Sequence, residues 1–268
     1  MPDNQLKNKI VLITGASSGI GEETAIVFAK AGASVILIAR NSDKLIQLAS
    51  SITKYGGIAF TYPLDISDYK QVIEQTTIIK KEIGIPDIII NNAGAGIWKH
   101  TEDTEWEEIS AFMAVPYFGA FYMTKAFLPE MLERKSGHIV NMTSYAGFIP
   151  FSGATAYIVA RKAMIGFHEA LSADLYKTGI KCSLAYFAKV TSSYWENNLG
   201  SEEKLPRSQA LIPIITPEIA AKSILNGVIK GRKHIYSPFL IAIFNFLIQY
   251  TPFITRIIIY KTGFKRKK

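Results

Sequence analysis

The chain has 268 residues, of which 49% are hydrophobic, and a formal net charge of +8 at pH 7. A chain of this size and composition can bury a large core, which excludes a disordered protein and a small disulfide-stapled scaffold. Nine Lys or Arg and no Asp or Glu lie from residue 230 onward, so residues 1–229 carry 8 − 9 = −1, which argues against a basic nucleic-acid-binding face on the main body.

The chain starts with MPDNQLKNKI, which lacks the basic and apolar order of a signal peptide, so we expect a cytoplasmic protein. Apolar runs rich in β-branched residues then alternate with segments of helical spacing. The predicted strands are residues 9–15, 34–39, 58–64, 86–92, 137–143 and 180–187, and the predicted helices are residues 22–30, 43–54, 69–82 and 107–132. This alternation predicts an α/β fold, a doubly wound parallel sheet with helices on both faces.

A glycine-rich loop, TGASSGIGEE, follows the first predicted strand directly and opens a helix. Gly15, Gly19 and Gly21 would allow a tight turn, close approach of the backbone to a pyrophosphate, and close packing of helix on sheet. The helix N-terminus would offer free N–H groups to the phosphates. The alternative is an ordinary glycine turn, which the position at the start of a βαβ unit disfavours.

The second predicted strand ends at Ala39 and is followed by Arg40. An acidic residue at this place would bond both ribose hydroxyls and repel a 2′-phosphate, whereas a cation suits the phosphate. With Ser17 and Ser18 in the nearby loop, Arg40 favours NADP(H) over NAD(H). The alternative is an ordinary solvated arginine at a strand end.

Four motifs in order, TGASSGIG, NNAG at 91–94, Ser144 in NMTSYAG and Tyr157 thirteen residues later, resemble the short-chain dehydrogenase/reductase family over residues 8–235. The resemblance implies a Rossmann-type sheet of about seven strands and a nicotinamide cofactor. It implies that Ser144 hydrogen-bonds the substrate oxygen and that Tyr157 is the general acid or base. The cofactor contacts that we expect are Gly15, Ser17, Ser18, Gly19, Ile20, Gly21, Arg40, Asp65, Ile66, Asn91, Ala93, Gly94, Tyr157, Arg161 and Val190.

The cation that serves the tyrosine is the first departure from the family, which places a lysine four residues after it. A free tyrosine has a pKa of about 10, and a nearby cation lowers it by roughly 1–3 units. On a helix, position i+4 lies about 40° from Tyr157 and i+5 about 140° away. Arg161 should therefore share the face of Tyr157, and Lys162 should point elsewhere. Arginine keeps the charge but cannot relay a proton.

Pro116 is the second departure, because the family commonly has an asparagine there that helps to hold a water of the proton relay. Proline removes the N–H that would bond the carbonyl of Phe112 and tends to kink the helix. Our hypothesis is that the freed carbonyl of Phe112 binds the same water. The alternative is loss of the relay.

The last predicted strand contains Cys182, the single cysteine, which excludes an internal disulfide and fits a reducing compartment. We expect it to pack as a core residue rather than act as a nucleophile. After the strand, Phe187 and Ala188 replace the Pro-Gly pair of relatives, which puts the backbone contact at Val190 in doubt. The segment that follows, with Tyr194 and Trp195 near its start, is expected to be a mobile lid over an apolar substrate.

We assign residues 1–235 to the catalytic domain and residues 236–268 to an apolar, basic extension. Two apolar runs, separated by Thr251 and Pro252, lead to a cap of Lys261, Lys265, Arg266, Lys267 and Lys268. We expect peripheral membrane contact through residues 238–268. Packing against the body, or against a second subunit, and a true membrane span are the alternatives.

The sequence thus predicts an NADP(H)-dependent oxidoreductase that interconverts a small apolar carbonyl compound and its alcohol. Ser144, Tyr157 and Arg161 are the predicted catalytic residues, and no metal site is predicted. By analogy with the family we expect a homo-oligomer. The alternative is a catalytically impaired nucleotide-binding regulatory or scaffold protein at a membrane surface.

Overall fold

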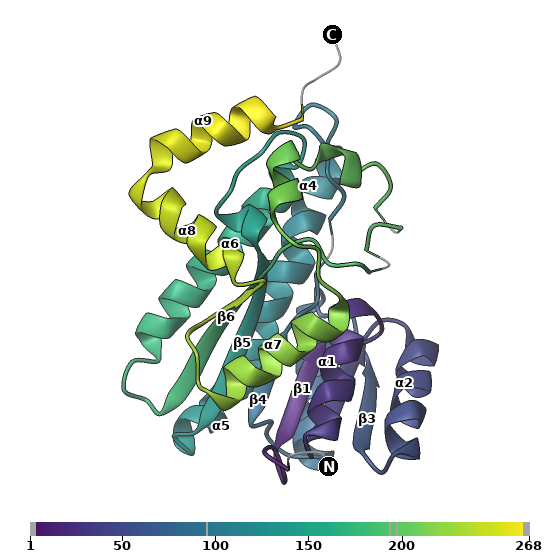
Figure 1. The fold of residues 1–268 in the computed structure, drawn as a ribbon. Coiled ribbons are helices and arrows are strands. Elements are labelled where there is room, and N and C mark those ends of the chain that lie inside the picture. Colours follow the sequence, from purple (N-terminus) through teal and green to yellow (C-terminus); the bar gives the residue numbers. More distant parts are fainter. Residues whose placement is uncertain (1–3, 95, 193, 197, 265–268) are drawn as a thin grey trace.

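A computed structural model describes residues 4–94, 96–192, 194–196 and 198–264 (Figure 1). The strands are β1 (Ile10–Thr14), β2 (Ser34–Ala39), β3 (Ile58–Pro63), β4 (Ile88–Asn91), β5 (Gly137–Ser144), β6 (Ile180–Phe187) and β7 (His234–Ser237). The α-helices are α1 (Gly19–Lys30), α2 (Ser42–Lys54), α3 (Tyr69–Glu82), α4 (Trp106–Met113), α5 (Ala120–Glu133), α6 (Thr155–Asp174), α7 (Pro217–Ile229), α8 (Leu240–Tyr250) and α9 (Pro252–Thr262).

The strands form one parallel sheet in the order β3-β2-β1-β4-β5-β6-β7, as the predicted alternation requires. The order reverses direction between β1 and β4, and in such sheets ligands bind beyond the carboxyl ends of the strands at this switch point. The predicted boundary between residues 235 and 236 is wrong. It cuts through β7, whose Tyr236 and Ser237 pair with Tyr186 and Phe187 of β6, so the extension begins only after Ser237.

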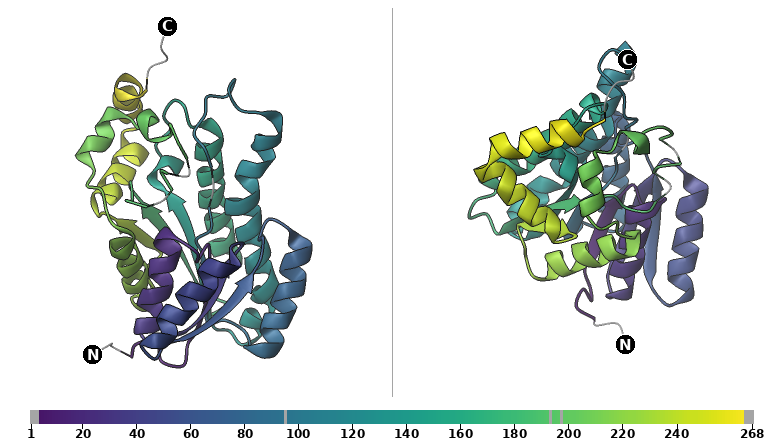
Figure 2. Two further views of the ribbon diagram at one scale, coloured as in Figure 1. Left: turned by 90° about the vertical axis from the view of Figure 1, so that its right-hand side faces the viewer. Right: turned by 45° about the horizontal axis from the view of Figure 1, so that its top comes forward.

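Helices cover both faces of the sheet (Figures 1 and 2). Successive side chains of a strand point to opposite faces, so Val11 and Ile13 of β1 pack into the core beneath α1, α2 and α7. Leu12 packs into the core beneath α3, α5 and α6. Phe28 of α1 and Phe127 of α5 are fully buried, one in each core. The loops that follow the strands are thereby held at one edge of a rigid sheet.

The predicted helix over residues 107–132 is interrupted at the proline that was expected to bend it. Between α4 and α5, residues Ala114–Gly119 form a π-helical turn that contains the buried Pro116. A proline cannot donate the hydrogen bond of a regular α-helical turn, and a π-bulge accommodates the lost bond. Phe112 lies one turn before the bulge and faces the large cleft described below.

The extension forms a hairpin of two short helices, α8 and α9, with a bend of 117° between them. Within the described residues, no single helix is long and apolar enough to cross a bilayer, and only this bent pair meets that test of length and composition. One face of the hairpin packs on the body: Ile241 is fully buried, and Nδ2 of Asn245 donates to the hydroxyl of Tyr236 at 2.9 Å. Lys265, Arg266, Lys267 and Lys268 of the predicted basic cap lie outside the described residues.

Candidate active site

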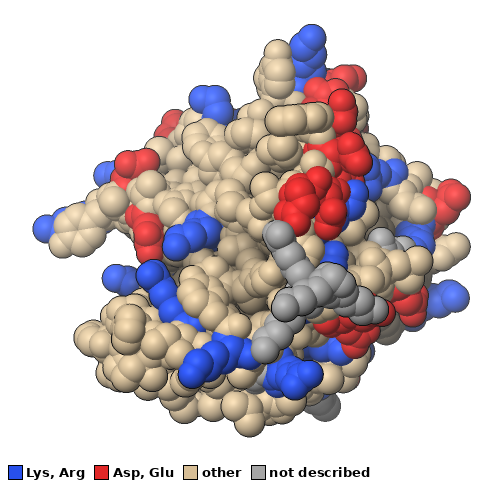
Figure 3. Space-filling view, turned by 90° about the horizontal axis from the view of Figure 1, so that it is seen from above, with Lys and Arg blue, Asp and Glu red and all other residues tan. Residues whose placement is uncertain are grey.

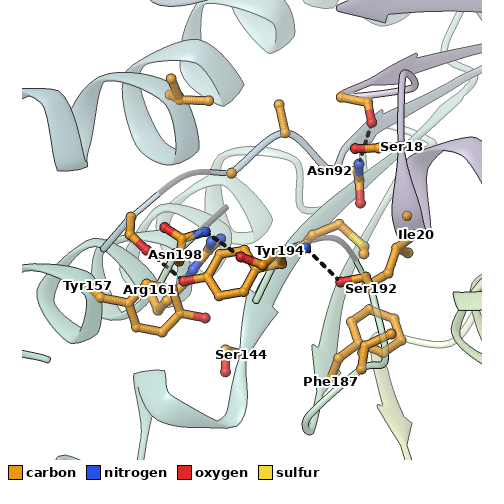
Figure 4. A pocket seen from close by; sticks show the side chains of 18 of the residues that line it. Ser18, Ile20, Asn92, Ser144, Tyr157, Arg161, Phe187, Ser192, Tyr194 and Asn198 are labelled. Carbon is orange, nitrogen blue, oxygen red and sulfur yellow. Dashed lines mark hydrogen bonds between the residues drawn. The ribbon is translucent and has the colours of Figure 1, made fainter. Parts of the chain in front are cut away.

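A cleft of about 840 Å³ runs along the carboxyl ends of the strands, from the loop after β1 to the N-terminal half of α6. Ser18 and Ile20 lie at one end of it, and Ser144, Tyr157 and Arg161 lie at the other (Figure 4). Of the predicted cofactor contacts, all but Asn91 and Gly21 line this cleft. One elongated cavity therefore brings together residues that are up to about 175 positions apart, as an extended dinucleotide requires.

The loop after β1 has the geometry that a phosphate needs. Gly15 and Gly19 adopt φ values of 68° and 58°, a region that side chains other than glycine rarely adopt. Gly21 faces inward, where a Cβ would overlap the carbonyl oxygen of Gly15 and lie 2.5 Å from Nδ2 of Asn92. Gly21 therefore serves close packing of α1 on the sheet and does not line the cleft. Helix α1 begins at Gly19 and points its free N–H groups at the cleft.

Asn91 lies away from the cleft, and its neighbour Asn92 lines it instead. The side chain of Asn91 is buried and donates from Nδ2 to Oγ1 of Thr124 and Oδ1 of Asn141, at 3.1 and 2.9 Å. Asn92 donates from Nδ2 to the carbonyl of Thr14 at 2.9 Å. The NNAG motif thus ties β4 to β1 and β5. Successive residues of a strand point to opposite sides, so the sequence could have indicated that only one of the two asparagines faces the cleft.

The polar end of the cleft contains the residues expected near an adenosine. Arg40, Asp65 and Ile66 line it together with Ser17 and Ser18. The carboxylate of Asp65 accepts from the backbone N–H and the hydroxyl of Ser67, at 3.0 and 2.6 Å.

A second, smaller hollow adjoins this end, and it was not predicted. It shares Ser17 and Ser18 with the cleft and adds the side chains of Lys44 and Glu22. Burial raises the pKa of Glu22, the charge of Glu23 raises it further, and Lys44 opposes the rise. Two cations, Arg40 and Lys44, therefore flank the serines of the glycine-rich loop, with one carboxyl group beside them.

At the other end of the cleft, Arg161 lies against the ring of Tyr157, as the helical spacing predicts. Its Cζ is 4.9 Å from the ring centroid, and the residue is only 8% exposed, whereas Lys162 is exposed. The backbone of this helical turn is fixed to β5, because Oγ1 of Thr143 donates to the carbonyl of Arg161 at 2.9 Å. Ser144 follows Thr143 at the end of β5 and faces the same cleft.

The guanidinium of Arg161 fits closely and leaves a donor for a ligand. A Cβ on Gly94 would lie 2.6 Å from its Nη2, so the glycine of NNAG makes room for it. Its Nε is buried and has no hydrogen-bond partner among the described residues. A buried charged donor without an acceptor is costly. The hydroxyl groups of a nicotinamide ribose are acceptors of the kind that this arginine lacks, so the residues present fit such a cofactor.

Aromatic side chains enclose this end of the cleft: Tyr194 and Trp195 of the predicted lid, and Trp98, to which the sequence assigned no role. Trp98, from the loop after β4, lies 5.2 Å from the ring of Tyr157 and 5.6 Å from that of Trp195, between centroids. The hydroxyl of Tyr194 donates to the carbonyl of Gly96 at 2.6 Å and accepts from Nε1 of Trp98 at 3.0 Å. Burial raises the pKa of Tyr194, and the neighbouring Tyr157 adds to the rise, so this hydroxyl stays protonated and can donate.

The segment expected to be a mobile lid is tied down over the cleft. The backbone N–H of Trp98 donates to Oγ of Ser201 at 3.0 Å, and Nζ of Lys204 donates to the carbonyl of Trp98. Nε1 of Trp195 donates to the carbonyl of Val190 at 2.9 Å. Val190, Phe187 and Ala188 all line the cleft, while Ser193 and Asn197 of the lid lie outside the described residues.

Cys182, the single cysteine, lies in β6 beside His168 of α6. Burial raises the pKa of Cys182 to about 11, so its side chain remains a thiol, 3.2 Å from Nδ1 of His168. Among the described residues, no group of three or more His, Cys, Asp or Glu side chains is placed to hold a metal ion.

Comparison with known proteins gives consistent results. Residues 9–202 match the family model described as short chain dehydrogenase. Human 17-beta-hydroxysteroid dehydrogenase 13 is 33% identical over 247 residues, which are 91% of this chain and 79% of that protein. A metagenomic short-chain oxidoreductase solved with NADP is 25% identical, with a TM-score of 0.73 over 87% of this chain and 97% of that one. A Burkholderia phymatum short chain dehydrogenase/reductase solved with NAD, at 21% identity, shares the fold with a TM-score of 0.83 over 98% and 99%.

Proposed function

The chain belongs to the short-chain dehydrogenase/reductase family and is a nicotinamide-dependent oxidoreductase, and we propose that it interconverts an apolar carbonyl compound and its alcohol with NADP(H). One observation carries the proposal. A buried guanidinium lies against the ring of Tyr157 at one end of a cleft whose other end is a glycine-rich phosphate loop. The cofactor supplies or accepts the hydride when it is bound.

The chain's own residues act on the oxygen of the reacting group. In the direction of reduction a negative charge grows on this oxygen, and the oxygen must be hydrogen-bonded and protonated. The hydroxyl of Ser144 donates a hydrogen bond to it, and the phenol of Tyr157 donates the proton. Arg161 would hold the ribose hydroxyls of the cofactor, and its charge would stabilise the phenolate that remains. In oxidation the same groups act in reverse.

Return of the proton to Tyr157 needs a route that does not deprotonate Arg161, because a guanidinium stays charged at any pH of interest. The π-helical turn at Pro116 leaves the carbonyl of Phe112 without its regular helical donor. Phe112 itself lines the cleft. The carbonyl of Phe112 would accept from a water that passes a proton between solvent and the phenol of Tyr157.

NADP(H) is the proposed cofactor because cations flank the end of the cleft where the adenosine ribose would lie. Arg40 lines the cleft, and Lys44 lines the adjoining hollow with Ser17 and Ser18. Two cations and two hydroxyls suit a 2′-phosphate. The carboxylate of Glu22 in the same hollow would repel a phosphate, and burial together with the charge of Glu23 raises the pKa of this carboxyl group.

An apolar substrate is proposed from the walls of the other end. Trp98 and Tyr194 face Tyr157 there, and Trp195 packs against both of them. Phe112 and Leu205 line the same space. Burying apolar surface against such walls is the main source of affinity for a ligand of this class. We further propose that the enzyme is cytoplasmic and homo-oligomeric, and that residues 238–268 make peripheral contact with a membrane.

The proposal is tested by following NADPH absorbance with a panel of apolar aldehydes and ketones, and by measuring NADPH and NADH binding separately by fluorescence. The wild type should consume NADPH with at least one of them and bind NADPH more tightly than NADH. Tyr157→Phe should reduce turnover by about 10²–10⁴-fold, the usual contribution of general acid–base catalysis, and still bind NADPH. Binding without consumption by the wild type across the panel would favour the regulatory or scaffold alternative.

A further inference from the structure

The exposed face of the α8–α9 hairpin is unusually apolar. Of 28 large hydrophobic side chains that are exposed among the described residues, ten come from this hairpin and the residue before it. They are Phe239, Ile243, Phe246, Leu247, Tyr250, Phe253, Ile254, Ile257, Ile258 and Tyr260. Soluble proteins rarely expose contiguous apolar patches of this kind unless the patch binds something.

The hairpin also packs against residues that form the substrate end of the cleft, although none of its own described residues lines it. Ile259 of α9 is buried in the same apolar cluster as Tyr157, Trp98 and Ile212, and α9 contacts the 3₁₀ turn Arg207–Leu211 of the lid. Just beyond α9, the ring of Phe264 lies 5.9 Å from that of His100. Helix α9 therefore spans from the lid to the loop that carries Trp98, and with the top of the molecule tilted forward it lies at the upper left (Figure 2, right).

The hairpin is positioned to lie at a surface rather than to cross a bilayer. Each helix has 11 residues, so each is about 16 Å long, roughly half the thickness of a bilayer core. Ile241 and Ile259 hold both helices to the body, and the pair bends by 117° at Thr251. We call this bend the elbow. Phe246 and Phe253, which lie before and after it in the chain, are 58% and 75% exposed.

The charge of residues 230–268 indicates which kind of surface the elbow contacts. From residue 230 onward the chain has nine cations and no acidic residue, and Arg256 and Lys261 lie on α9 itself. In the view from above, the lower left, where Figures 1 and 2 put the hairpin, has basic side chains among uncharged ones, and most acidic side chains lie toward the upper right and right (Figure 3). A second copy docked through the same face would bring like charges together. An anionic lipid surface would attract them.

We infer that the α8–α9 hairpin docks the enzyme on an anionic lipid surface, with the elbow inserted, so that a substrate dissolved in the lipid enters the cleft beside α9. The inference rests on the proposed function for the identity of the substrate as an apolar carbonyl compound or alcohol, whereas the docking itself does not. The acidic side of the same end would be repelled by the lipid. This repulsion would orient the molecule so that the elbow contacts the lipid and the acidic side points away from it.

Docking is tested by flotation of the full chain with phosphatidylcholine vesicles that contain or lack phosphatidylserine. Wild type should float with the anionic vesicles, and binding to the neutral ones should be at least tenfold weaker. The double variant Phe246→Glu with Phe253→Glu should lose flotation. The matched control is Ile73→Glu with Tyr176→Glu, which adds two charges at side chains that are 61% and 73% exposed elsewhere, and it should float as wild type does.

Delivery is tested by NADPH consumption with a long-chain aldehyde held in anionic vesicles and with a short water-soluble one. The elbow variant should be at least tenfold slower than wild type on the first and equal to it on the second. Equal rates on both would overturn delivery from the lipid. Flotation of the elbow variant, or a hairpin-dependent dimer of wild type that does not float, would overturn docking. Wild type that floats but consumes no NADPH contradicts the proposed function and the delivery step, and flotation alone still supports docking.

Discussion

The phosphate end of the cleft is made of backbone, whereas the substrate end is made of large side chains. Gly15 and Gly19 shape the first from one loop directly after β1. Trp98, Tyr157 and Tyr194 shape the second from the loop after β4, from α6 and from the lid. A backbone site allows little substitution because its atoms approach the ligand directly. A site of packed side chains can change its specificity while the fold remains.

The largest effect is expected at the backbone end. Gly21→Ala would place a methyl group against the carbonyl oxygen of Gly15, and neither backbone segment can move without displacing α1 from the sheet. We expect NADPH affinity to fall at least about 100-fold and the free energy of unfolding to fall by about 1–3 kcal/mol. Titration of NADPH fluorescence and chemical denaturation measure the two.

The control for that variant is Gly166→Ala on α6, where a Cβ would meet nothing within 4 Å. Alanine favours the helix over glycine by about 0.5–1 kcal/mol, so stability should rise and NADPH binding should not change. If Gly21→Ala bound NADPH as wild type does, the packing role assigned to Gly21 would be wrong.

The contrast between a local backbone site and a site of side chains from distant segments also determines which features can be predicted from the sequence. The parallel sheet follows from local spacing, and the structure confirms it. Local spacing also predicts the glycine-rich turn and the place of Arg161, and the structure has Gly15 and Gly19 at positive φ and Arg161 beside Tyr157. Trp98 was missed because it meets Tyr157 from 59 positions away in a loop without periodicity. The end of the domain was misplaced because β7 has only four residues, too few for a pattern. Contacts between distant segments are set by packing, and one sequence does not reveal it.

An acid titration should distinguish the two halves of the sheet. All four histidines lie between residues 100 and 234. Burial lowers the pKa of His138 and of His168 to about 4, with the charges of Lys181 and His234, respectively, adding to the effect. Each is less protonated in the folded than in the unfolded chain between pH 4 and 6.5. Their neutral burial therefore costs little above pH 6.5, and stability is lost as the pH falls from 6.5 to 4.

We expect His138 and His168 each to lower the free energy of unfolding by about 1–2 kcal/mol at pH 5 relative to pH 7. Hydrogen exchange at the two pH values, corrected for intrinsic rates, should show protection lost in β5, β6 and α6 before β1 and β2. His138→Gln should remove about half of the loss, since glutamine can still donate to Oγ of Ser183, which His138 Nε2 meets at 2.7 Å. A stability that is flat between pH 7 and 5 would contradict the burial of these two rings as neutral groups.

A smaller effect is expected from the lid. Tyr194→Phe removes the hydroxyl that donates to Gly96 and accepts from Trp98, but keeps the ring against Tyr157. Two lost hydrogen bonds, partly offset by water, should raise KM for an apolar substrate about tenfold. NADPH affinity should not change, because the phosphate end is built separately. Tyr176→Phe, on a tyrosine that is 73% exposed, is the control. A change in NADPH affinity rather than in KM would mean that the two ends are coupled through the lid.

The smallest effect is expected from Arg161→Lys, because it keeps the charge that the proposal requires. Arg161→Lys keeps a cation on the face of Tyr157 and opens space beside Gly94, where the guanidinium is now closely packed. A lysine can also pass a proton, which an arginine cannot. We therefore expect kcat/KM to stay the same or to rise by up to about threefold, with a pH–rate profile that gains a limb from the new amine. Arg161→Met keeps the length without the charge and should lose turnover. If Arg161→Lys abolished turnover as Arg161→Met does, then the shape of the guanidinium and not its charge would be what Tyr157 requires.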